Sequence, residues 1–180
     1  MTSTGTSATR LIVLRGNSGS GKTTVARAVR ARYGQGCALV EQDYLRRIVL
    51  RERDVDGGIA PALIAHTARF ALDHGYHVVL EGILARVRYG AMLTDLCHAH
   101  RGRTTVFYLD IPWEETLRRH ATRLQSCEFG EAEMREWFLP RDLLGIEGER
   151  IIDQGLTTEE TIELVAAELN GVPPATRILD

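Results

Sequence analysis

One run of residues, 11–24, constrains this chain more than any other part of the sequence. Leu11 to Leu14 are four consecutive apolar residues, a pattern typical of a short buried strand. Residues 16–23, Gly-Asn-Ser-Gly-Ser-Gly-Lys-Thr, match the pattern G-x-x-x-x-G-K-[ST] at every fixed position, and apolar residues with helical spacing follow at once. A strand, this loop and a helix in direct succession predict a phosphate-binding loop.

The residue types in this loop explain how it would hold a triphosphate. Glycines allow positive φ and a close backbone approach, so consecutive N–H groups can curve around an anion. The helix that follows adds unpaired N–H groups and the positive end of its dipole. We expect Lys22 to reach the β and γ phosphates and the Thr23 hydroxyl to hold Mg²⁺. The residues expected to bind the nucleotide are Gly16, Asn17, Ser18, Gly19, Ser20, Gly21, Lys22, Thr23 and Thr24.

Two other interpretations of the loop fit less well. A solvent-exposed Gly/Ser loop would need neither the apolar strand before it nor the helical pattern after it. A dinucleotide-binding loop built on residues 19–21 would need Gly or Ala at position 24, where the chain has Thr24.

Length and composition describe one ordinary globular domain. The chain has 180 residues, of which 44% are hydrophobic and 26% charged, and this suits a single α/β domain. The net charge of −2 argues against general nucleic-acid binding and against an anionic membrane surface. The three cysteines lack C-x-x-C spacing, which favours reduced thiols in the cytoplasm over disulfides or zinc. Residues 1–9 are small and polar, and we expect a disordered tail there.

Apolar strands alternate with helical patterns along the whole chain. We expect strands at residues 11–14, 37–40, 76–80, 105–109 and 150–153, with helices between them, including one from Tyr44 to about Arg53. The alternation predicts a parallel sheet with right-handed crossovers, an α/β fold. Ligands in such sheets bind beyond the carboxyl ends of the strands, which draws attention to Asp43, Glu81 and Asp110.

Two of these acids are candidates for chemistry. Asp43 follows the second strand, where a carboxylate could accept the proton of a substrate hydroxyl during phosphoryl transfer. The alternative is a loop aspartate that makes a turn or a cap. Glu81 ends the apolar third strand and could act on Mg²⁺ directly or through water, although any buried strand can end in an acid. We expect Asp110, which precedes Ile111-Pro112, to be a structural turn residue.

Arg119 and Arg123 are four residues apart, so a helix would place them on one face. Facing the phosphates, they would stabilise charge that develops on the transferred group. The alternative is a solvated basic edge of the helix. We expect Trp113 and Trp137 to be packing residues, and the histidine pairs do not have the geometry of a metal site.

The chain resembles the small P-loop kinases of adenylate-kinase-like fold, such as shikimate kinase, gluconate kinase and chloramphenicol phosphotransferase-like enzymes. The resemblance rests on the loop at 16–24, on Asp43 at a substrate-side acid position, and on 114–123, Glu-Glu-Thr-Leu-Arg-Arg-His-Ala-Thr-Arg. That segment is similar to the helix leading into the kinase lid, with Arg119 and Arg123 at its paired arginine positions. The resemblance implies one three-layer kinase domain over residues 10–171, a C-terminal tail at 172–180, ATP and Mg²⁺, and a five-stranded parallel sheet ordered 2-3-1-4-5.

The resemblance also implies a mobile lid at about residues 124–149, with Arg135 or Arg141 as a further lid arginine. The loop at 153–156 resembles the segment that touches the adenine. The chain departs from its relatives after two strands: Asp43 is a single acid without a neighbouring aspartate, and the third strand ends Glu81-Gly82 where several relatives carry glycines before an arginine. These departures leave the acceptor unassigned.

Three functions remain open from the sequence. The first is an ATP-dependent phosphotransferase acting on a hydroxyl of a small metabolite or antibiotic. The second is a nucleoside or nucleotide kinase, and the third is a regulatory ATPase switch. The chain lacks the guanine-specifying Asn-Lys-x-Asp motif, and Lys22 is its only lysine, which argues against a switch. We expect a cytoplasmic protein without nucleic-acid or membrane partners, and the sequence leaves a homodimer open.

Overall fold

Five parallel strands form one sheet in the order β2-β3-β1-β4-β5 in the computed structural model, which describes residues 2–121 and 130–169. The expected α/β fold and strand order are confirmed. The strands are β1 (Arg10–Gly16), β2 (Cys37–Glu41), β3 (His77–Gly82), β4 (Arg103–Asp110) and β5 (Arg150–Asp153). Each of the four strand pairs is parallel, so the carboxyl ends of all five strands lie at one edge.

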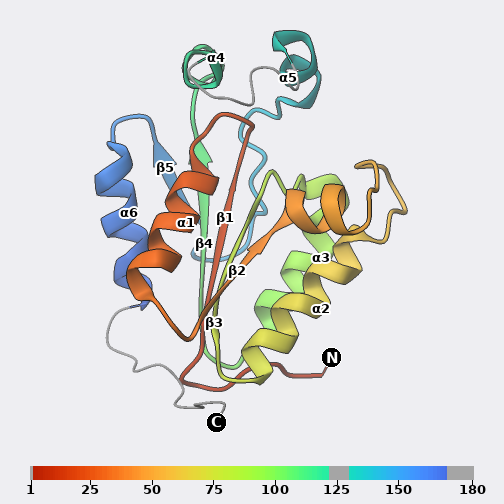
Figure 1. Cartoon of the computed structure of the whole chain (residues 1–180), viewed down its shortest axis with the longest axis vertical. Helices are drawn as coiled ribbons and strands as arrows, with labels where there is room; N and C mark the ends of the chain where they lie inside the picture. Colours follow the sequence, from red (N-terminus) through yellow and green to blue (C-terminus); the bar gives the residue numbers. More distant parts are fainter. Residues whose placement is uncertain (1, 122–129, 170–180) are drawn as a thin grey trace.

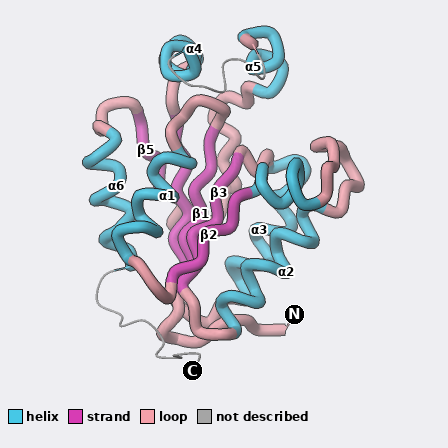
Figure 2. The backbone as a smooth tube through the Cα atoms, viewed as in Figure 1, coloured by secondary structure: helices cyan, strands magenta, loops and turns pink. Residues whose placement is uncertain are grey.

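Helices cover both faces of the sheet, which gives the expected three layers (Figures 1 and 2). The α-helices are α1 (Lys22–Tyr33), α2 (Ala60–Asp73), α3 (Arg86–Ala99), α4 (Trp113–Ala121), α5 (Glu131–Trp137) and α6 (Thr158–Ala166). The short helix η3 (Ala167–Leu169) follows α6. Helices α1 and α6 lie on one face, α2 and α3 on the other, while α4 and α5 lie beyond the carboxyl edge (Figure 1).

The core has two halves, one on each face of the sheet, because side chains of β1 alternate between them. Ile12 and Leu14 belong to the half under α1 and α6, whereas Leu11 and Val13 belong to the half under α2 and α3. All four side chains are buried, so β1 is covered on both faces of the sheet, as the continuous apolar run predicts. Apolar burial on both faces therefore fixes the strand from which the phosphate-binding loop emerges.

The segment after β2 differs from the α-helix expected there. Residues Tyr44–Val49 form a π-helix, η1, in which the Leu50 N–H donates to the Leu45 carbonyl at 3.0 Å, five residues back. None of its six residues is buried. Leu45 packs, partly buried, against the core, but no residue of the segment is fully buried, so burial enforces α-helical periodicity only weakly. Such π-turns are frequent at functional sites.

The N-terminal residues also differ from the disordered tail expected at 1–9. Thr4 is buried, pairs with His100 as an isolated β-bridge, and donates through its hydroxyl to Asp73 at 2.7 Å. The Thr9 hydroxyl lies 2.9 Å from His100 Nε2. Polar side chains on the body of the domain thus hold this segment, although its own composition lacks an apolar stripe.

The segment that returns from α5 to β5 is fastened to the sheet by a buried arginine. Arg15 in β1 is fully buried, and its guanidinium donates to the Leu84 carbonyl at 2.9 Å, to the Asp142 carboxylate at 2.8 Å and to Glu149 at 3.3 Å. Leu144 packs in the core beside these groups. The structure describes residues 130–149 of the expected lid, and mobility of the lid stays a prediction.

Candidate functional site

The loop between β1 and α1 is shaped by glycines that no other residue could replace. Gly19 has φ +80°, and a Cβ there would lie 2.6 Å from the Thr116 carbonyl oxygen of α4. Gly16 has φ +147°, and its Cβ would lie 2.7 Å from the Leu109 carbonyl oxygen of β4. Both contacts are shorter than any carbon–oxygen approach that a side chain tolerates. The loop is therefore pressed against β4 and α4. The Ser20 N–H donates to the Asn17 carbonyl at 3.2 Å, and the glycines allow other N–H groups of the loop to face an anion.

Lys22 begins α1 and closes this loop. Its side chain is buried, and Nζ donates to the Asn17 carbonyl at 3.0 Å, bridging the two ends of the loop. No side chain caps the N-terminus of α1, and its first turn carries no acid. The amino end of the helix and the lysine charge are thus directed at one place, an arrangement that fits a nucleotide phosphate.

Thr23 and Glu81, the two residues predicted to hold Mg²⁺, lie next to each other beside the loop. The Thr23 hydroxyl lies 3.2 Å from both carboxylate oxygens of Glu81. Glu81 is buried at the end of β3, and it stands opposite Glu41 of β2 in the register. Burial raises the pKa of Glu81; the charges of Glu41 and Asp43 raise it further, whereas Lys22 lowers it.

These residues fit a Mg²⁺ ion held mainly by phosphate and water. No group of three or more His, Cys, Asp or Glu side chains arranged to hold a metal occurs among residues 2–121 and 130–169. Mg²⁺ in phosphoryl-transfer sites needs only one or two protein oxygens in addition to substrate phosphates. Thr23 and Glu81 supply a hydroxyl and a carboxylate of this kind.

Asp43 lies on the same side of the loop, exposed at the start of η1. Its carboxylate accepts from Arg46 Nη2 at 2.8 Å, and Arg46 Nη1 donates to the Glu52 carbonyl at 3.1 Å. A cavity of about 520 Å³ joins Asp43 to the Thr23–Glu81 pair. Its lining consists of Thr23, Arg27, Glu41, Asp43, Tyr44, Arg47, Ile48, Glu81 and Gly82. The structure thus brings three predicted site residues to one cavity.

Arg119 reaches the loop from α4. Its Nη1 donates to the Ser20 carbonyl at 3.1 Å, and its Nε donates to Glu115 at 2.6 Å. Hydrogen bonds from Arg118 and Arg119 lower the pKa of Glu115 to about 2. Arg123, the second arginine of the expected pair, lies outside the described residues.

A further cavity, of about 420 Å³, lies on the other side of the loop. It is lined by Gly21, Thr24, Arg118, Arg119, Gln154, Gly155, Leu156, Thr157 and Thr158. Part of the loop expected near the adenine is therefore present here. A capping box at the start of α6 borders this cavity: the Glu160 N–H donates to Thr157 Oγ1, and the Thr157 N–H donates to the Glu160 carboxylate.

Two buried polar residues near the site were not found by sequence reasoning. In the sequence, Arg15 is a single charged residue within an apolar strand, and this position was the only indication that it is buried and paired. Gln42 is buried beside Gly82, and its Oε1 accepts from the Leu84 N–H at 2.9 Å. This bond shapes the turn after β3, where the sequence departs from its relatives.

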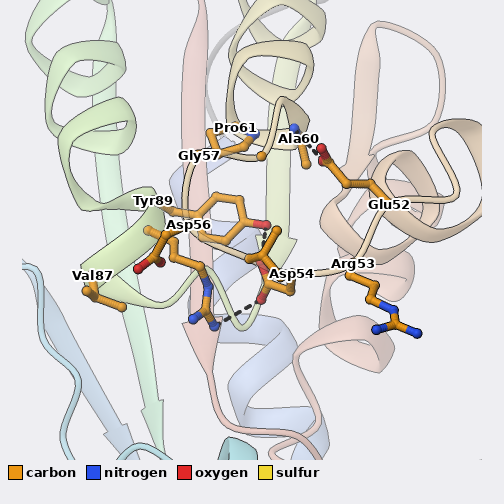
Figure 3. A pocket seen from close by; sticks show the side chains of 12 residues that line it. Glu52, Arg53, Asp54, Asp56, Gly57, Ala60, Pro61, Val87 and Tyr89 are labelled. Carbon is orange, nitrogen blue, oxygen red and sulfur yellow. Dashed lines mark hydrogen bonds and ion pairs between the residues drawn. The ribbon is translucent and has the colours of Figure 1, made fainter.

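A small cavity of about 250 Å³ opens between the loop at 52–58 and the start of α3 (Figure 3). The Asp54 carboxylate accepts from Tyr89 OH at 2.8 Å and from Arg88 at 3.1 Å. Glu52 accepts from the Ala60 N–H at 2.8 Å and so caps α2. These acids hold the local structure together, and none of the predicted site residues lines this cavity.

A glycine-rich loop that joins a buried strand to a helix, at the carboxyl edge of a parallel sheet of this order, defines a P-loop nucleotide-binding fold. A family model described as an AAA domain matches residues 11–137, and the chain belongs to this family. A comparison with curated proteins found no match. None of the helices within residues 2–121 and 130–169 has the length and apolar character required to cross a membrane.

Solved structures with this fold are small kinases and related proteins. The APS kinase of Mycobacterium tuberculosis, in complex with AMPPNP and APS, is 17% identical, with a TM-score of 0.67 over 93% of this chain and 98% of that one. A sugar kinase from Janibacter sp. is 21% identical, with a TM-score of 0.66 over 92% and 96%. The tunicamycin resistance protein of Deinococcus radiodurans is 18% identical, with a TM-score of 0.62 over 94% and 99%. The expected fold of the small P-loop kinases is confirmed.

Proposed function

We propose that this protein is an ATP-dependent phosphotransferase that moves the γ-phosphate of ATP to a hydroxyl of a small molecule. The observation that carries the proposal is the pair of cavities on opposite sides of the phosphate-binding loop. Gly21 and Thr24 line one of them, and Thr23 lines the other. A nucleotide and an acceptor could therefore meet at the end of the loop, which is the geometry that direct transfer requires.

The residues of the loop and its neighbours would divide the chemistry of transfer among them. Lys22 and Arg119 would stabilise negative charge on the transferred group, since both reach the loop. Thr23 and Glu81 would hold Mg²⁺, which neutralises phosphate charge when bound. Asp43 would orient the acceptor hydroxyl and accept its proton as the new O–P bond forms and ADP leaves with the electrons of the broken bond.

The structural relatives support this choice of reaction class. Two are kinases by name, and one was solved with the ATP analogue AMPPNP. A nucleoside or nucleotide kinase remains the alternative, because such an enzyme would use the same loop and the same acceptor side. A regulatory ATPase would need no acceptor cavity beside Asp43, so the cavity favours a kinase over a switch. We place the reaction in the cytoplasm.

The decisive experiment follows the label of γ-phosphate-labelled ATP in the presence of a panel of nucleosides, sugars, and aminoglycoside- or phenicol-like compounds. The panel is first screened by thermal shift with ADP present. We expect label in an organic product, and a decrease of more than tenfold in Lys22→Ala, which loses charge stabilisation worth more than about 1.4 kcal/mol. Label that is released only as inorganic phosphate, at a rate the panel does not change, would favour the regulatory ATPase instead.

A further inference from the structure

We infer that the acceptor is an uncharged hydroxyl compound with an apolar or aromatic face, and that Tyr44 and Ile48 of η1 bind this face. The inference rests on the proposed phosphotransferase function and names its substrate class. It concerns the cavity of about 520 Å³ beside Thr23 and Glu81, called here the acceptor cavity.

The charges that line the acceptor cavity argue against an anionic acceptor. Three carboxylates line it, those of Glu41, Asp43 and Glu81, against the two guanidinium groups of Arg27 and Arg47. The Mg²⁺ ion expected at Thr23 and Glu81 would have its charge met by the phosphates of ATP, to which it is expected to bind. The cavity therefore offers no surplus of positive charge to a phosphate, sulfate or carboxylate.

Both arginines that line the acceptor cavity also interact already with other residues of the protein. Arg27 Nε donates to Glu41 at 2.7 Å, and Arg47 interacts with another residue of the chain. Arg46, next to the cavity, donates to Asp43. An anionic acceptor would have to break one of these pairs, and its charge would also lie beside the phosphates of ATP. Both effects oppose binding.

The apolar part of the inference comes from η1. Tyr44 and Ile48 line the acceptor cavity, yet they are 55% and 65% exposed. Both side chains line the same cavity from one short helix, so both present apolar surface to a molecule bound there. An acceptor that covers this surface removes it from water, which favours binding by a non-polar contact. The polar end of the cavity, at Asp43 and Glu81, remains for the hydroxyl that is phosphorylated.

Helix η1 also provides a matched control within the same six residues. Val49 is 53% exposed and follows Ile48 directly, but it does not line the acceptor cavity. Ile48→Ser and Val49→Ser thus remove similar exposed apolar groups from one short helix. A general effect on folding or on η1 would appear in both variants, whereas loss of an acceptor contact would appear in Ile48→Ser alone.

The test measures phosphate transfer from MgATP to acceptors that differ in one property at a time. Phenyl glucoside, glucose and 4-carboxyphenyl glucoside share a sugar ring with all of its hydroxyls; the second lacks the aromatic face and the third adds a carboxylate to it. Nucleosides with their 3′-monophosphates, which keep the 5′-hydroxyl free, form a second matched set. We expect kcat/KM to be at least tenfold higher for the uncharged member with an apolar face. Ile48→Ser should raise KM about tenfold for that member, with kcat and ATP affinity retained, and Val49→Ser should leave KM unchanged.

Three results would overturn the inference: faster transfer to the carboxyphenyl glucoside or the monophosphates, equal KM values for Ile48→Ser and Val49→Ser, or ATP binding without transfer to any uncharged member. Transfer to the anionic members alone would leave the proposed phosphotransferase function intact. Failure of the wild-type protein to bind ATP, measured by calorimetry without an acceptor, would instead contradict the proposed function. The two failures are therefore distinguishable.

Discussion

The side-chain amide of Asn17, in the phosphate-binding loop, forms two hydrogen bonds with the backbone of Leu139. Asn17 Nδ2 donates to the Leu139 carbonyl at 2.9 Å, and Asn17 Oδ1 accepts from the Leu139 N–H at 2.8 Å. Tyr108 OH donates to the same carbonyl at 3.1 Å. The loop is thus joined to the point at which the chain leaves α5 and returns to the sheet.

Asn17→Ala should lower the free energy of unfolding by about 1–3 kcal/mol, because the Leu139 N–H and carbonyl both lose their hydrogen bonds to Asn17, while the bond from Tyr108 to the carbonyl remains. Urea unfolding measures the loss, and hydrogen exchange should be faster at the Leu139 amide. Ser18→Ala, one residue further along, is the control. Unchanged exchange at Leu139 would show that the two bonds do not hold this segment.

Within residues 130–149 of the expected lid, nucleotide binding should slow hydrogen exchange in α5 and not in residues 139–149. Residues 139–149 are fastened to β1 by Arg15 and to the loop by Asn17, whereas α5 (Glu131–Trp137) lies beyond the sheet edge (Figure 1). An ATP analogue with an acceptor should slow hydrogen exchange in α5 and leave the amides at 139–149 unchanged. Equal protection of α5 with and without these ligands would remove the lid from the mechanism.

Asp43→Asn should reduce phosphate transfer by about a hundredfold or more, because it removes the charge and most of the basicity of the group expected to take the proton. ATP affinity should barely change, since the loop at 16–23 carries it. Rates and ATP affinity are measured in the same variant, with Asp95→Asn, an exposed aspartate on α3, as the control. Transfer at the wild-type rate would mean that Asp43 is structural, and the base would then be sought at Glu81.

Local patterns predicted the fold and the phosphate-binding loop, while contacts between distant residues could not be predicted. The glycines and Lys22 act within one short stretch, and strand ends meet at one edge because the sheet is parallel. Arg15, in contrast, finds its partners 69 to 134 residues away. The π-helix η1 was also not predicted, because its sequence has ordinary helical propensity, and an apolar pattern of six residues, none of them buried, does not distinguish π-helical from α-helical hydrogen bonding.

Stability should fall as the pH decreases from about 6.5 towards about 4, in part because of His100. Burial, with the charges of Arg10 and His77, lowers the pKa of His100 from 6.5 to about 4. Between these values the unfolded chain binds a proton that the folded protein does not, so stability decreases by up to about 1.4 kcal/mol per pH unit. His100→Asn should have a flatter pH profile of unfolding, whereas His66→Asn, at an exposed site, should keep the wild-type slope.

Arg15→Met should destabilise the protein by about 3–5 kcal/mol, because Asp142 and Glu149 would keep their charges without the buried cation between them. Chemical unfolding of the purified variant measures this loss. Arg103→Met is a suitable control, since Arg103 is exposed and the buried Glu168 keeps its bonds to Arg150 and Thr105, so this pair should contribute about 1 kcal/mol or less. Equal effects of the two substitutions would contradict a special role for Arg15.

The ion pairs of Arg15 also limit which segments of this domain could be replaced by the corresponding segments of a related protein. A loop that contacts the body of a protein only through its own backbone can be replaced by recombination. Here the guanidinium of Arg15, one residue before the phosphate-binding glycine, takes carboxylate partners from residues 142 and 149. A chimera that imports another lid without both acids would bury an unpaired cation at the base of the nucleotide site. The lid and the strand that precedes the phosphate-binding loop must therefore be inherited together.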